Sequence, residues 1–120
     1  MKANELRIGN LVHFFKDTPA MAVAISSHTL YLTQGGGFIN PKTEECVPIP
    51  LTEEWLLRFG FEKSGRFYRL GALTIEVRKT YFRVCLCGNF LVNLLFVHKL
   101  QNLYFALTGE ELKLKDDENN

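Results

Sequence analysis

Arginines and aromatic residues are interleaved through the middle of the chain, between residues 58 and 83. This segment holds seven Lys and Arg residues against two Glu, although the whole chain has a formal charge of only +1. Guanidinium groups pair bidentately with phosphates, and aromatic rings stack on bases. The pattern predicts a surface for a small nucleotide ligand, with nucleic acid as a less favoured alternative. The candidate ligand-binding residues are Arg66, Tyr68, Arg69, Arg78, Tyr81 and Arg83.

A plainer interpretation of the same charges is a solvated sheet face that balances acidic segments elsewhere, and the sequence alone favours it. Residues 44–54 contain four Glu and no basic residue, and residues 110–120 contain five acidic residues against two Lys. Which basic side chains share a face depends on strand register, and the sequence leaves that register open.

Histidine and carboxylate chemistry has little support. His13, His28 and His98 are scattered, and none has a partner at the spacing of a catalytic triad or an HExxH zinc site. Adjacent glutamates such as Glu53 and Glu54 point in different directions on a helix, so a cap and a solvated face explain them. We therefore expect no enzymatic activity, no metal site and no cofactor.

The cysteines could in principle hold zinc. Cys85 and Cys87 lie two residues apart, so on a strand both thiols would share one face. The C-x-C spacing differs from the usual zinc knuckle, and the chain has only one further cysteine. Packing opposite Phe90 and Val92 in a hairpin is the better interpretation.

The first fifty residues predict a small β-meander of SH3-like style, because short β-prone runs alternate with turn residues. Met21, Val23 and Ile25 alternate with alanines, as in a strand with one small-residue face. Gly35–Gly37 is expected to be a loop, since three glycines lose too much entropy in a strand. The segment Gln34–Lys42 could be a binding loop, but a plain connector is the favoured interpretation.

Residues 51–60 predict a short helix. Thr52 suits the N-cap, Leu51 and Leu56 have the spacing of a hydrophobic staple, and Gly60 ends the helix. Residues 61–93 then predict a second antiparallel sheet, with turns at Ser64-Gly65, Leu70-Gly71, Lys79-Thr80 and Gly88-Asn89.

The last predicted element is an amphipathic helix that packs on the second sheet. Phe96, Leu100, Leu103 and Leu107 follow the 3.6-residue period, and Gly109 suits the C-terminal stop. The polar residues between them, among them His98, Gln101 and Asn102, are expected on the other side of the helix.

Three blocks of the chain carry a resemblance to a known family: Leu6–Asn10 (LRIGN), Pro48–Phe61 (PIPLTEEWLLRFGF) and Val97–Leu112 (VHKLQNLYFALTGEEL). In these blocks the chain resembles a family of small proteins of Bacteroidetes, their phages and mobile elements, for which no activity is established. The resemblance implies a phage- or prophage-associated accessory protein. It implies no functional residues.

Length and composition bound the remaining choices. The 120 residues and 13.8 kDa suit a single domain. No apolar run is long enough for a membrane helix, and Met1–Glu5 lacks the apolar core of a signal peptide, so a cytoplasmic protein is expected.

We therefore predict one α+β domain over residues 1–115, with a β-meander subregion at 1–50, a helix–sheet–helix subregion at 51–115 and a frayed acidic tail at 116–120. Its predicted role is that of a non-enzymatic interaction or binding module of a phage or mobile element. The predicted partners are a host protein, or a nucleotide signal that the protein sequesters as an anti-defence ligand sponge. Weak nucleic-acid binding is a further alternative, and a homo-oligomer is expected.

Overall fold

The computed structural model describes residues 6–14, 19–25, 30–34, 37–39 and 46–115. These residues form an α+β structure, as predicted, with two antiparallel sheets and two helices. The predicted tail at 116–120 lies outside the described residues.

The chain divides into two compact units. The first consists of Met1–Ile49 and Phe96–Glu111, and the second consists of Pro50–Leu95 and Leu112–Asn120. The predicted subregion boundary near residue 50 therefore coincides with the start of the second unit. The C-terminal helix, however, belongs to the first unit.

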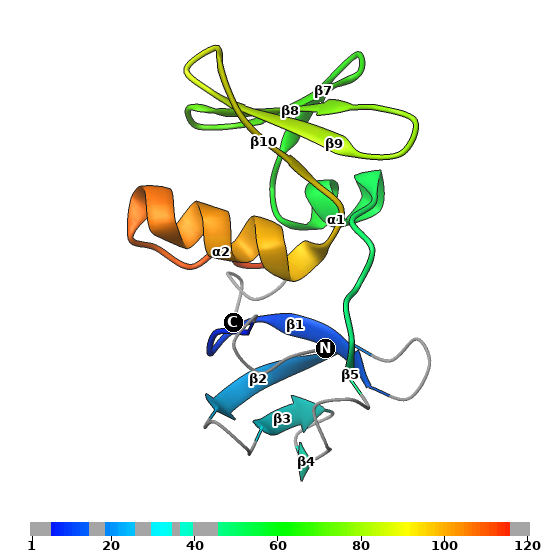
Figure 1. The fold of residues 1–120 in the computed structure, drawn as a ribbon, viewed down its shortest axis with the longest axis vertical. Coiled ribbons are helices and arrows are strands. Elements are labelled where there is room, and N and C mark those ends of the chain that lie inside the picture. The colour runs from blue at the N-terminus through cyan, green and yellow to red at the C-terminus, as the bar shows by residue number, and fades with distance from the viewer. Residues whose placement is uncertain (1–5, 15–18, 26–29, 35–36, 40–45, 116–120) are drawn as a thin grey trace. The chain divides into compact units, whose positions relative to one another are not determined.

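The first unit contains a five-stranded antiparallel sheet with the order β4-β3-β2-β1-β5 (Figure 1). Its strands are β1 (Leu11–Phe14), β2 (Pro19–Ile25), β3 (Leu30–Gln34), β4 (Gly37–Ile39) and β5 (Cys46–Val47). Gly37 begins β4 rather than lying in the predicted loop, and Gly35 and Gly36 are outside the described residues. The meander is confirmed, and its SH3-like character stays a prediction.

Helix α2 (Val97–Thr108) is tied to the turn that precedes β1 by polar side chains. The Leu11 N–H donates to Gln101 Oε1 at 2.8 Å, and Gln101 Nε2 donates to the Gly9 carbonyl at 3.1 Å. The Asn10 side chain donates to Asn102 Oδ1 at 2.8 Å. The helix thus supplies hydrogen-bond partners for backbone groups that burial would otherwise leave unpaired.

With these bonds, the helix buries a different face from the predicted one. Gln101 and His98, expected on the solvent side, are buried, whereas Leu107, expected in the core, is 40 % exposed. Leu100 is buried as predicted, and Leu103 is half-buried. The hydrogen bonds of Gln101 place the helix in the first unit, beside β1, and its packing on the second sheet stays a prediction.

Arg7 makes further contacts between the start of the chain and helix α2. Its guanidinium forms an ion pair with Glu111, donates to Asn102 Oδ1 at 3.2 Å and lies 4.3 Å from the Phe105 ring centroid. One arginine therefore joins the start of the chain, the helix and the segment after it.

The second unit begins with helix α1 (Glu53–Arg58), which follows the predicted signals. The Trp55 N–H donates to the Thr52 hydroxyl at 3.4 Å, so Thr52 is the N-cap. Gly60 follows the C-cap with φ +95°, a left-handed conformation that suits glycine. Leu56 and Phe59 are buried, as expected for the core face of this helix.

The second sheet is five-stranded, with the order β10-β9-β8-β7-β6, so each strand pairs with its neighbour in sequence. Its strands are β6 (Glu62–Ser64), β7 (Phe67–Leu70), β8 (Leu73–Val77), β9 (Phe82–Leu86) and β10 (Asn89–Leu94). This arrangement confirms the predicted meander.

A two-residue turn joins β9 to β10. Cys87 and Gly88 have φ of 51° and 84°, the left-handed pair that a tight hairpin of the type I′ class needs. Cys87 therefore leaves the strand, and the two thiols do not share a strand face as the sequence suggested. Cys85 stays in β9 and pairs with Phe90, as predicted.

We expect Gln101→Leu to lower the free energy of unfolding by about 1–3 kcal/mol, because it leaves the buried Leu11 N–H without an acceptor. Urea-induced unfolding followed by circular dichroism measures the change. Leu107→Ala is the control, and as an exposed substitution it should cost under about 0.5 kcal/mol. The opposite ranking of the two variants would contradict the observed orientation of α2.

Candidate functional site

The second sheet has one buried face and one open face. Tyr68, Ile75 and Val84 lie opposite one another on β7, β8 and β9 and are at most 1 % exposed. Because side chains alternate along a strand, their sequence neighbours point to the other side. The open face consists of two cross-strand rows: Ser64, Phe67, Glu76, Arg83 and Asn93 in one, and Glu62, Arg69, Thr74, Cys85 and Phe90 in the other.

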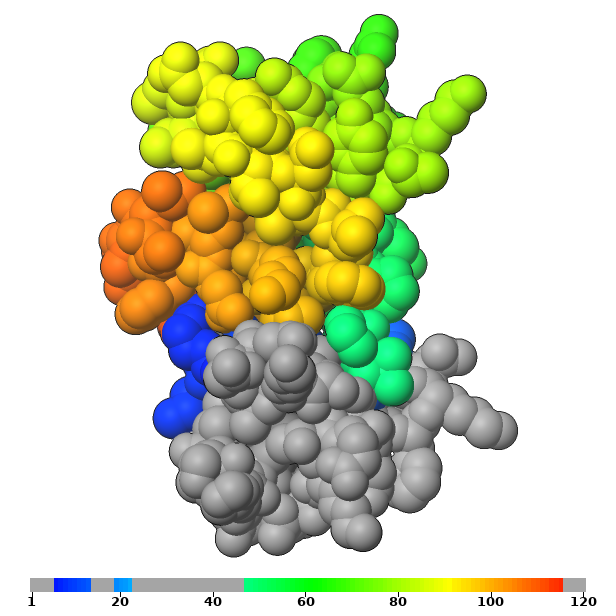
Figure 2. Space-filling view, viewed as in Figure 1, coloured from blue at the N-terminus to red at the C-terminus, as the bar shows by residue number. Residues whose placement is uncertain are grey.

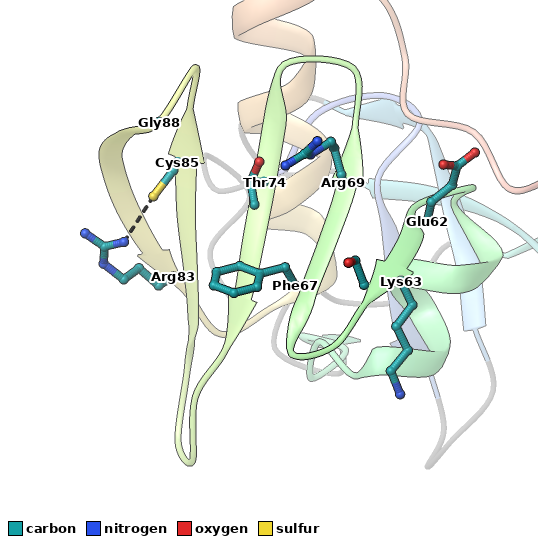
Figure 3. A pocket seen from close by; sticks show the side chains of 9 residues that line it. Glu62, Lys63, Phe67, Arg69, Thr74, Arg83, Cys85 and Gly88 are labelled. Atoms are coloured by element: carbon teal, nitrogen blue, oxygen red, sulfur yellow. Dashed lines mark hydrogen bonds between the residues drawn. The ribbon is translucent and has the colours of Figure 1, made fainter.

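A hollow of about 550 Å³ lies on the open face. Figure 3 shows Thr74 between Arg69 and Cys85, with the Phe67 ring in the neighbouring row. The volume falls within the range of small-molecule sites, roughly 300–1,000 Å³. The remaining lining residues are Glu62, Lys63, Ser64, Arg83 and Gly88.

Two arginines in this hollow keep their charge available. Arg69 is exposed, and its guanidinium forms no hydrogen bond or ion pair with any other residue that the structure describes. Arg83 lies 4.9 Å from the Phe90 ring centroid and donates to Cys85 Sγ at 3.2 Å. Within the described ranges, neither guanidinium forms an ion pair with a carboxylate, so both can pair with an incoming anion.

Two other predicted arginines share a single acid, so that cluster keeps a net charge of +1. Arg66 Nη1 lies 3.7 Å from one Glu76 oxygen, and Arg78 Nε lies 3.2 Å from the other. The Glu76 side chain is only 11 % exposed, whereas those of Arg66 and Arg78 are 67 % and 44 % exposed. One nearly buried carboxylate therefore holds two guanidinium groups at the margin of the open face.

The two predicted tyrosines do not join the arginines. Tyr68 is buried on the opposite face of the sheet, so its ring is not available to stack on a ligand. Tyr81 precedes β9, is half-buried, and its carbonyl accepts the Arg78 N–H at 3.0 Å. The prediction of Tyr68 as a ligand-binding residue is wrong because its parity along the strand is opposite to that of Arg69.

The aromatic residues of the open face are Phe67 and Phe90, which the set of candidate residues omitted. They are 42 % and 52 % exposed. Phe67 lies two residues before Arg69, and strand periodicity alone could have placed both on one face. Phe90 could be found only from the β9–β10 register, which depends on the two-residue turn.

Tyr68 instead fixes the sheet to helix α1. Its hydroxyl donates to Glu53 Oε1 at 2.7 Å, and Lys63 Nζ lies 4.0 Å from the same oxygen. Burial raises the pKa of Tyr68 from its usual 10.0 to about 12, and the hydrogen bond to Glu53 and the charge of that carboxylate add to the rise. The phenol is therefore a protonated donor throughout the physiological range.

Other chemistry is sparse in the part of the chain that the structure describes. No group of three or more His, Cys, Asp or Glu side chains there could hold a metal ion, and no helix there is long and apolar enough to span a membrane. No family model matches the sequence, and no curated protein or solved structure is significantly similar to it.

We expect the stability of the protein to fall as the pH rises from 10 towards 12, partly because Tyr68 then ionises in the unfolded state before it does so in the folded state. A group whose folded pKa is raised stabilises the fold fully below its unfolded pKa and loses that contribution as the pH passes its folded pKa. Tyr68→Phe should remove this part of the alkaline loss.

Denaturant midpoints across this pH range measure the effect. Tyr81→Phe is the control and should keep the pH dependence of the unchanged protein. An identical alkaline loss in Tyr68→Phe and in the unchanged protein would contradict the assignment.

Proposed function

We propose that this protein is a non-enzymatic binding module that takes a nucleotide on the open face of its second sheet. The observation that carries the proposal is the pair of arginines without acidic partners, Arg69 and Arg83, in one hollow with the exposed ring of Phe67. The arginines can bind the phosphates of a nucleotide, and the ring can stack on its base.

The arginines suit the phosphates. They occupy β7 and β9, with only β8 between them, and lie in neighbouring rows. Two strand spacings and a two-residue offset along the strand put their backbones about 12 Å apart. Long side chains from both positions can converge on one phosphate or on two consecutive ones. Arginine presents a planar fork of donors that fits a phosphate in a bidentate way.

The rings suit the base. Phe67 and Phe90 lie on the same face as the arginines, from strands on either side of β8 and β9. Stacking on an aromatic side chain is worth about 1–3 kcal/mol per base and tolerates every base. The Ser64 and Thr74 hydroxyls line the same hollow and can donate to or accept from a sugar or base edge.

A single nucleotide fits these charges better than a nucleic-acid strand. A strand needs a continuous track of cations along its backbone. Here Glu76 offsets one of the two positive charges of Arg66 and Arg78, and Glu62 adds a negative charge to the lining. The two available arginines match the few phosphates of a mononucleotide or a small cyclic nucleotide.

In a phage or mobile-element setting, as the sequence resemblance implies, sequestration of a nucleotide signal in the host cytoplasm is the role we propose for this binding. Such a role needs affinity and no chemical step. A host protein as a further partner is compatible with it.

Calorimetric titration with nucleoside mono- and triphosphates and with cyclic nucleotides tests the proposal. Arg69→Ala and Arg83→Ala should each weaken binding by about tenfold or more, the loss of a charge-assisted hydrogen bond. Phe67→Ala should weaken nucleotide binding by a similar factor and leave pyrophosphate binding unchanged, because pyrophosphate has no base.

Lys99→Ala is the matched control, since Lys99 is an exposed cation on α2 in the other unit. It should bind like the unchanged protein. Absence of nucleotide binding at millimolar concentration would refute the proposal. Tight binding of an oligonucleotide, falling steeply with salt, would replace it with the nucleic-acid alternative.

We further expect Glu76→Gln to strengthen nucleotide binding by roughly two- to tenfold at low salt, because it removes the negative charge that pairs with Arg66 and Arg78. The same titration at increasing salt measures it, and the gain should shrink as ions screen the added field. Weaker binding in a folded Glu76→Gln protein would show that the carboxylate itself contacts the ligand.

A further inference from the structure

Strand β10 forms one edge of the second sheet and has a free side. It pairs with β9 alone, and β6 forms the opposite edge. Beyond the end of the strand, the Leu95 carbonyl accepts the Leu51 N–H at 2.9 Å. Along Asn89–Leu94 itself, no backbone hydrogen bond is formed to any described residue outside β9. The free side therefore carries N–H and C=O groups that another strand can pair with.

The two edges differ in how they resist such pairing. β6 has three residues, of which Glu62 and Lys63 are charged, and short charged edges discourage strand addition. β10 has six residues, and the chain from Gly88 to Val97 contains neither a charged residue nor a proline. Its only protective feature is a bulge between Phe90 and Val92.

β10 also exposes apolar side chains that a partner strand would cover. Phe90, Leu91 and the adjoining Leu95 are 52 %, 39 % and 51 % exposed. In the space-filling view, the yellow atoms of the β9–β10 region lie at the surface (Figure 2). An uncharged, apolar edge of this length is a recognised site for pairing with another chain.

We propose that β10 pairs in antiparallel fashion with β10 of a second copy of this chain. A two-fold contact sets each strand against its own sequence in the reverse direction, so the charges of the strand alone decide whether like charges meet. β10 carries no charge, and this self-pairing therefore has no electrostatic cost. The strand also lacks the charges by which an edge would select a different partner.

The other self-contact, β10 against β6, fits less well. It would place the apolar edge beside Glu62 and Lys63, and it would be a head-to-tail contact that can continue into an open filament. The two-fold contact closes after two copies.

The geometry of a two-fold contact determines how the open faces of the two copies are arranged. When two antiparallel edge strands pair about an axis normal to the sheet, corresponding faces lie on the same side. The open faces of both copies would then be continuous, with both Phe90 residues near the joint. A single strand pair buries little area, so we expect a weak dimer that forms at micromolar to millimolar concentration.

Sedimentation velocity over a concentration series tests the proposal without any ligand, so its result is independent of the proposed nucleotide site. The unchanged protein should show a monomer–dimer equilibrium. Leu91→Lys should shift it to monomer by at least tenfold in dissociation constant, because lysine on an edge strand blocks pairing. Ser64→Lys, the matched change on the β6 edge, should dimerise like the unchanged protein.

Asn93→Lys provides a second blocking variant on the exposed side of the strand, and circular dichroism checks that each variant is folded. Hydrogen exchange should slow at the amides of β10 as the unchanged protein dimerises and should stay constant in the blocked variants. A protein that is monomeric at millimolar concentration would overturn the proposal. So would dimers that both folded blocking variants still form, or dimers that Ser64→Lys abolishes.

Discussion

The buried ladder of Tyr68, Ile75 and Val84 is the constraint on which the open face depends. These side chains lie opposite one another on three adjacent strands and are almost completely inaccessible to solvent. A shift of one residue in any of these strands would turn its buried side chains outward and its polar ones inward. The hydrogen bond from Tyr68 to Glu53 adds a polar restraint to this register. Arg69, Phe67 and Arg83 reach the open face because their neighbours are held on the other one.

Charge is distributed unevenly over that face. Glu76 lies between Phe67 and Arg83 in its row, yet its carboxylate is directed to Arg66 and Arg78. Such a nearly buried acid needs partners, since an unpaired carboxylate at low exposure is unfavourable. Its two ion pairs leave the centre of the hollow with the cations that have no acid of their own. The positive character of the site therefore comes from which arginines are engaged, as much as from how many there are.

Local signals predicted much of this structure. The cap at Thr52 and the stop at Gly60 depend on residues within a few positions of one another, and the structure confirms them. Three turns of the second sheet contain the predicted glycines but are displaced by one residue, to Gly65-Arg66, Gly71-Ala72 and Cys87-Gly88. Orientation depends on distant residues and was predicted less well. Helix α2 is rotated because Gln101 bonds to the backbone around Gly9, which lies some ninety residues earlier in the chain. Hydrophobic periodicity does not register such a bond.

The contrast between local and distant interactions also explains which residues of the candidate site could be predicted. The sequence located the basic segment, and strand alternation was sufficient to separate Arg69 and Phe67 from Tyr68. The assignment of Arg66 and Arg78 to Glu76 required the pairing of β8 with its neighbours and the course of long side chains at the margin. Composition shows how many charges a segment has, but the availability of each charge is a property of the fold.

Arg83 links the open face to the free edge of the sheet. Its guanidinium lies over Phe90 of β10 and beside Cys85, so an anion that binds Arg83 must share or displace these contacts. A second strand against β10 would in turn restrict Phe90, the ring on which Arg83 lies. Any influence of the anion on strand pairing is matched by an equal influence of pairing on anion affinity, because the two equilibria form a closed thermodynamic cycle. The β9–β10 hairpin is therefore the element through which ligand binding and self-association would be coupled.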